Sequence, residues 1–229
     1  LSKLNLFLPL KAFFSSDFLL KKGIIAFEKN NIKDLTKVTS IFLPRIINKR
    51  LNKIFAEGNL EGEFILRFNT DGTLDKNYGF RGKISEALIK ITKEFSLRNL
   101  TTEINNNEGA QSNDFKIKII KGSFLDLELD GSNINLTRKK NYTKINSLLH
   151  TSGKANLSQI KMITSILGKN INFLKDMNIE ADIFTNLSFD LANSFKAKNL
   201  VYAANGNIKL LNLETNENKA IKTYLPLYE

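Results

Sequence analysis

Hydrophobic and polar residues alternate along much of the chain, with the period of two that is typical of a half-buried β-strand. The segment GEFILRFN, around Phe64, alternates in this way and is followed by the turn residues of NTDGTLDKN. The segment DFKIKIIKGSFLDLELDG, from Asp114 to Gly131, predicts a series of hairpins with turns at Gly122 and at Asp130-Gly131. One side of these strands is apolar and the other is polar, which is typical of an antiparallel sheet with one solvated face.

Further strands are predicted on both sides of these segments, at LLKKGIIAF, GFRGKISEALIKI, NIEADIF, LSFDL, NLVYAA and NIKLLNLE, with a hairpin turn at the NGN around Gly206. The sequence therefore predicts a mainly β fold with a few short helices, in the α+β class, built on a long antiparallel sheet. No linker divides the chain, and we expect a single β-rich segment over residues 1–229. Within it we expect a leading region of strand and helix at 1–57 and the antiparallel sheet at 58–229.

Hydrophobic residues recur at helical spacing in three places. Asp34 is a favourable N-cap for the first predicted helix, and Pro44 suits the first turn of the second. The second helix is expected to carry Ile46, Ile47, Leu51, Ile54 and Phe55 on one face, with Arg45, Lys49, Arg50 and Lys53 on the other and Gly58 at its C-cap. A third helix is predicted near 158–169, with Ser158 as its cap.

The formal net charge is +11, and the chain is rich in Lys, Asn, Ile, Phe and Leu. Two interpretations stay open: the coding bias of an AT-rich genome, and attraction to an anionic partner, either lipid or nucleic acid. The absence of cysteine excludes disulfide and thiol chemistry. The chain starts at Leu1, and we expect it to be a piece of a longer protein. Its apolar beginning, LSKLNLFLPLKAFFSSDFLL, is interrupted by charges and predicts neither a transmembrane helix nor a signal peptide.

Residues that carry catalytic chemistry are scarce. His150 is the only histidine, expected at a strand end, and the sequence has neither a nucleophile elbow nor a phosphate-binding glycine loop. Asp126, Glu128 and Asp130 share one face of a predicted strand, where carboxylates can do acid–base work or bind Ca²⁺. A solvated sheet face explains them more simply, so we expect no enzyme activity, no cofactor and no metal site.

Nucleic-acid binding by stacking needs aromatic residues on the same face as the basic ones. Phe64, Phe68, Phe115 and Phe189 are instead in phase with leucines and isoleucines, on the side opposite the charges. We therefore expect no nucleic-acid partner.

The segment LPRIINKRLNKIFAEGNLEGEFILRF resembles the AsmA-like envelope proteins of Gram-negative bacteria, most closely their YhdP-type branch. Pro44, Arg50, Gly58 and Gly62 fall where that pattern has its proline, arginine and glycines, and the style of the strands continues from Gly58 to Glu214. The chain departs from the family in having no tryptophan, and Leu51 follows Arg50 where the family helix often has an aromatic residue.

The resemblance implies a central fragment of a periplasmic protein that is anchored in the inner membrane by a helix upstream of this chain. Its sheet would curve, and its apolar face would form a groove that shields phospholipid acyl chains between the inner and outer membranes. The lipid-groove candidates are Phe64, Leu66, Phe68, Ile117, Ile119, Leu125, Leu127, Leu129, Ile179, Ile183, Leu187 and Phe189. The headgroup-contact candidates are Arg45, Lys49, Arg50 and Lys53.

Two alternatives stay open. The same apolar residues would also suit a closed core with nothing bound, and the second helix would suit a cover over a sheet edge or a core. The alternative function is a structural or adhesive β-protein of the cell surface that binds protein partners. A continuous open apolar face favours lipid binding, whereas a closed sandwich or a solenoid with a filled interior favours the alternative.

Overall fold

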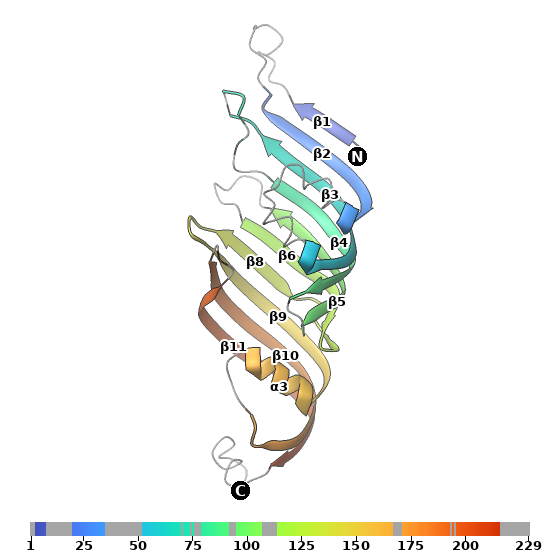
Figure 1. Ribbon diagram of the computed structural model, residues 1–229, viewed down its shortest axis with the longest axis vertical. Helices are drawn as coiled ribbons and strands as arrows, with labels where there is room; N and C mark the ends of the chain where they lie inside the picture. The colour runs from blue at the N-terminus through green and yellow to red at the C-terminus, as the bar shows by residue number, and fades with distance from the viewer. Residues whose placement is uncertain are drawn as a thin grey trace.

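The computed structural model describes residues 3–7, 20–34, 52–69, 71–73, 75, 79–91, 95–106, 114–166, 171–192, 194 and 196–215. The predicted fold class is confirmed, since these residues form one antiparallel sheet of eleven strands with little helix (Figure 1). The strands are β1 (Lys3–Phe7), β2 (Lys22–Asn31), β3 (Phe55–Arg67), β4 (Gly79–Lys90), β5 (Ser96–Asn106), β6 (Asp114–Phe124), β7 (Leu127–Glu128), β8 (Asn133–Arg138), β9 (Tyr142–Asn156), β10 (Leu174–Ala192) and β11 (Ala197–Thr215).

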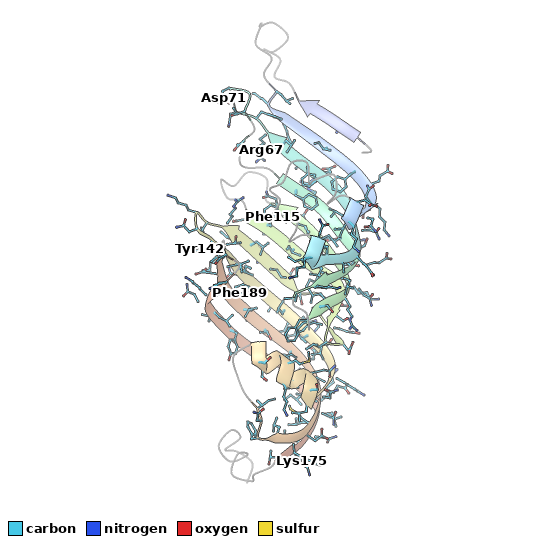
Figure 2. All side chains as sticks on the ribbon, in the orientation of Figure 1. Arg67, Asp71, Phe115, Tyr142, Lys175 and Phe189 are labelled. Atoms are coloured by element: carbon cyan, nitrogen blue, oxygen red, sulfur yellow. The ribbon has the colours of Figure 1, made fainter. Side chains whose placement is uncertain are left out.

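The strands follow one another across the sheet in chain order. Their order is β1-β2-β3-β4-β5-β6-β7-β9-β10-β11, and β8 pairs with the first half of β6 and with β9. The sheet is twisted and elongated, with β1 at one end and β11 toward the other (Figure 1). Strand β10 is long: in Figure 2, Lys175 at its start lies far from Phe189 near its end.

Cross-strand register places the predicted apolar positions on one face of the sheet, because directly paired residues point to the same side. On β2, β3 and β4, Ile25 pairs with Phe64, which pairs with Phe80. Further along, Ile117 pairs with Ile104 and with Ile134. We call this side the apolar face and the opposite side the polar face.

The most buried part of the apolar face lies across β4, β5 and β6. The core cluster consists of Ile32, Ile84, Ala87, Leu100, Ile119 and Leu129. Gly58 reaches this cluster from β3, where a Cβ would lie 2.8 Å from the Cβ of Ala87. The expected helix C-cap at Gly58 is therefore wrong: the glycine is a strand residue at φ 130° that lets two strands approach.

A second cluster on the apolar face is aromatic. The ring centroids of Phe27, Phe64 and Phe80 lie 5.0 to 6.5 Å apart. Gly62 pairs with Gly82 beneath them, and a Cβ on Gly82 would come within 2.6 Å of the Phe80 ring. The missing side chains let the rings lie against the backbone, which compensates for the weak strand preference of glycine.

The helical parts differ from their predicted bounds. Residues 32–34 and 52–54 are helical, and helix α3 spans Leu157–Ile166. The Lys33 N–H donates to the Asn31 side chain at 2.9 Å, so Asn31 and not the expected Asp34 caps the turn at 32–34. The rest of the first predicted helix lies outside the described residues. The second predicted helix ends before Phe55, which begins β3, and its earlier part lies outside the described residues. No helix in the described residues is long and apolar enough to cross a membrane.

Several strand predictions are too short or misplaced. The two segments NIEADIF and LSFDL form one strand, β10, and NLVYAA and NIKLLNLE form one strand, β11. Asn205-Gly206-Asn207 is consequently not a turn but the middle of β11. The sheet also begins before residue 58, since β1, β2 and the start of β3 belong to it, and β5 and most of β9 were not predicted as strands.

Candidate functional site

Eleven of the lipid-groove candidates occupy the apolar face or continue it at the end of a strand. Nine are paired strand residues, whereas Phe68 follows β3 and Leu129 follows β7. Ile119, Leu127 and Leu129 are buried, with at most 7% exposed. The remaining eight are half-buried: Phe64, Leu66, Phe68, Ile117, Ile179, Ile183, Leu187 and Phe189.

Leu125 is the exception among the candidates. With Asp126 it forms the turn between β6 and β7, and both residues have positive φ angles, 51° and 64°. The turn was expected at Gly122, which is instead a buried residue within β6. Alternation across Leu125, Leu127 and Leu129 therefore does not place all three on one strand. The expected turn at Asp130-Gly131 is confirmed, with Gly131 at φ 79°.

Helix α3 lies over β9 and β10 (Figure 1), and the apolar face is hollowed beneath it. A pocket of about 330 Å³ lies between the helix and the sheet, and we call it the α3 pocket. Its roof includes Ile160 and Ile163 of α3. Its floor includes Leu187 and Ile183 of β10. Five of the lipid-groove candidates line the pocket: Leu127, Leu129, Ile179, Ile183 and Leu187.

Small residues create the depth of this pocket. Gly153 and Ala155 of β9 pair with Ala181 and Ile179 of β10, and all four line the floor beneath the helix. Larger side chains there would fill the space up to Ile160 and Ile163. The sequence signal for this pocket is a run of small residues at alternate positions, which sequence reasoning did not use.

The helix is tied to the sheet at its N-terminus. Asn156 and Gln159 form a reciprocal capping box: the Gln159 N–H donates to the Asn156 side chain at 3.1 Å, and the Asn156 N–H donates to the Gln159 side chain at 2.8 Å. The Gln159 amide nitrogen also donates to the carbonyl of Leu125 at 2.8 Å. The cap is thus Asn156 and not the expected Ser158, and one glutamine joins α3 to the β6–β7 turn.

The polar face carries a second cluster, around His150, which lies within β9 rather than at a strand end. Its Nδ1 is 2.8 Å from the carbonyl oxygen of Asp130, and its Nε2 is 2.8 Å from Oδ1 of Asp182. The ring stacks on Phe184, with centroids 4.5 Å apart. The hydrogen bond to the Asp130 carbonyl and then that to Asp182 raise the pKa of His150 above its usual value.

Two of the carboxylates that the sequence singles out contact neighbouring groups of the sheet. The Asp130 carboxylate accepts the Gly122 N–H at 3.0 Å, and Asp126 lies 3.9 Å from Arg98 in an exposed ion pair. Lys53 is exposed in the helical turn 52–54, whereas Arg45, Lys49 and Arg50 lie outside the described residues. Across the described ranges, no group of three or more His, Asp and Glu side chains could hold a metal ion.

Comparison with known proteins gives no relative: no family model, no curated protein and no solved structure matches the chain.

Proposed function

We propose that this chain is a non-enzymatic lipid-binding segment whose apolar face shields phospholipid acyl chains. The observation that carries the proposal is the continuity of that face, which the strand registers place on one side of the sheet from Ile25 on β2 through Phe64 and Ile117 to Leu187 on β10. Many of its side chains are only half-buried, and among the described residues the sheet is a single layer without a second sheet packed against it. An apolar surface of this extent on a soluble protein is typical of a binding site.

The resemblance of the segment around Pro44 and Gly58 to AsmA-like proteins supports a place in the cell envelope. The proposed setting is the periplasm, in a longer protein anchored in the inner membrane, with phospholipid moving between the two membranes. The net charge of +11 suits contact with anionic headgroups. Arg45, Lys49, Arg50 and Lys53 remain the proposed headgroup contacts.

The test is native mass spectrometry with lipid extraction on the protein purified from a Gram-negative host. The variant Phe64→Glu/Ile117→Glu puts two carboxylates on the apolar face, away from the α3 pocket. The matched control, Lys83→Gln/Lys118→Gln, lowers the net charge by the same two units from exposed positions on the polar face. We expect phospholipid on the wild-type and control proteins and at least a tenfold loss from the apolar-face variant, with circular dichroism confirming that each is folded.

A folded wild-type protein without phospholipid would contradict the proposal and direct attention to the second candidate, a structural or adhesive β-protein. The edge strand β11 favours that candidate. Its residues from Ala197 to Asn212 are exposed, among them Val201 at 67% and Ile208 at 58%. Such an edge can pair with a strand of a protein partner.

A further inference from the structure

We propose that the α3 pocket holds a single hydrocarbon chain, lying lengthwise along β10 with its polar end toward Tyr202. The inference deepens the proposed function and rests on it only for the source of the chain, a membrane lipid. It assigns the binding site of one hydrocarbon chain to one defined part of the apolar face.

The lining of the pocket determines the chemistry of the occupant. Ile160, Ile163, Ile179, Ala181 and Ile183 present only aliphatic groups, and none of the residues that line the pocket is charged. Thr151, Thr185 and Tyr202 contribute its side-chain hydroxyl groups. Burying a charged or strongly polar group here would leave it without enough partners, so the occupant must be hydrocarbon over most of its length.

The dimensions of the α3 pocket suit one hydrocarbon chain better than a ring system or a complete lipid. The lining residues of β10 run from Ile179 to Leu187, a distance of about 27 Å at the usual rise per strand residue. The pocket has a volume of about 330 Å³ between the helix and the sheet. It is roughly twice the volume of an apolar cavity of about 150 Å³ that accommodates benzene, which leaves room for part of one lipid chain.

The two ends of the pocket differ. The end near Ala155 and Ile179 lies beside the start of α3, where Gln159 fastens the helix to the Leu125 carbonyl. The end near Leu187 meets Tyr202, which is 42% exposed on the edge strand. A chain would therefore place its methyl end toward the helix N-terminus and its polar end toward the exposed tyrosine.

The test uses cis-parinaric acid, a fluorescent 18-carbon fatty acid, titrated into the delipidated protein. Ala181→Leu fills the pocket from the floor, opposite Gly153, without introducing polarity. Ala203→Leu makes the same change on the polar face of β11 and is the matched control. We expect one saturable site in the wild-type and Ala203→Leu proteins, and at least a tenfold weaker affinity in Ala181→Leu.

Ala155→Leu fills the same pocket from β9 and replaces Ala181→Leu if that variant does not fold. Undiminished binding by the folded filled variant, or no saturable site in the wild type, would overturn the inference. Its failure is distinguishable from failure of the proposed function, because Ala181→Leu should still carry phospholipid on the rest of the apolar face. Conversely, a wild type that binds cis-parinaric acid in the pocket but carries no extracted phospholipid would keep the one-chain site and contradict the proposed function.

Discussion

Both ring nitrogens of His150 face atoms that accept hydrogen bonds, the carbonyl oxygen of Asp130 and the carboxylate of Asp182. A neutral imidazole has one N–H and can satisfy only one of them, whereas the imidazolium ion donates to both. Ser132 reinforces the same junction, since its hydroxyl accepts the His150 N–H at 2.9 Å. The protonated side chain therefore links the turn at 130–131 to β9 and β10.

This geometry predicts a pH dependence of stability with a definite sign. The pKa of His150 is raised in the folded protein, so the stabilisation is complete below the unfolded value of about 6.5 and is lost as the pH rises through the folded-state pKa. We expect His150→Gln to lower the melting temperature by roughly 2–4 °C at pH 6, corresponding to about 1 kcal/mol, and by much less at pH 8.5. Differential scanning calorimetry at both pH values measures the difference.

NMR provides an independent check, because His150 is the only histidine and its ring protons give an unambiguous titration. The midpoint should lie above 6.5, and in Asp182→Asn it should fall but stay raised, since the carbonyl of Asp130 is the larger cause of the shift. A midpoint at or below 6.5 in the wild type would show that the imidazolium is not favoured.

Among the elements, α3 has one side chain, that of Gln159, that both completes its capping box and attaches it to the β6–β7 turn. Gln159→Ala removes the acceptor of the Asn156 N–H and the donor to the Leu125 carbonyl, while the Asn156 side chain can still accept the N–H of residue 159. We expect a loss of about 1–2 kcal/mol in the free energy of unfolding, measured by urea denaturation. Amide exchange in residues 157–166 should also become faster, because the helix is no longer held to the sheet.

Gln159→Glu separates the two roles. A glutamate at this position keeps the side-chain acceptor for the Asn156 N–H but lacks the N–H that donates to the Leu125 carbonyl. The variant should therefore retain helix protection while α3 becomes less firmly attached, and it should be less destabilised than Gln159→Ala. Equal loss of protection in both variants would mean that the capping box contributes little.

The strands also show how much of the fold the sequence could predict. Period-two alternation identified most strands and their apolar sides, since burial of one face determines which residues alternate. Strand length was not predictable where glycine occurs. Gly206 has the neighbours of a turn residue, yet it lies in β11 where a Cβ would be 2.1 Å from the carbonyl oxygen of Asp182. Glycine marks both turns and close backbone approach, and only tertiary structure distinguishes them.

The candidate site was also predictable only in part. Alternation found the apolar face, but Leu125 fell in a turn because two residues with positive φ reverse the chain before Leu127. The α3 pocket was not predicted, since it depends on where the helix lies over Gly153 and Ala181, which are far apart in the sequence. The sequence predicted the helix and the floor as separate elements and gave no measure of the gap between them.

For the molecule as a whole, the topology makes contacts almost entirely local along the sheet. Each strand pairs with the next in the chain or the one after it, from β1 at one edge to β11 at the other. The core cluster around Ala87 and Leu100 lies in the middle, whereas nearly all of β11 is exposed. In such a linear arrangement, the free energy of unfolding is approximately a sum of terms from neighbouring strands. The edge strands can therefore open while the central strands stay folded.

We therefore expect native-state hydrogen exchange to show a gradient, with the slowest amides in β4, β5 and β6 and much faster exchange in β11. Ile208→Gly, at an exposed position of β11, should weaken protection in β10 and β11 alone. Leu100→Ala, at a position 3% exposed in the core cluster, should cost about 2–5 kcal/mol and lower protection throughout the sheet. If Ile208→Gly reduces protection in β5 as much as in β10, the sheet opens as one cooperative unit. The long row of half-buried side chains would then be held by coupling across the entire sheet rather than by its central strands.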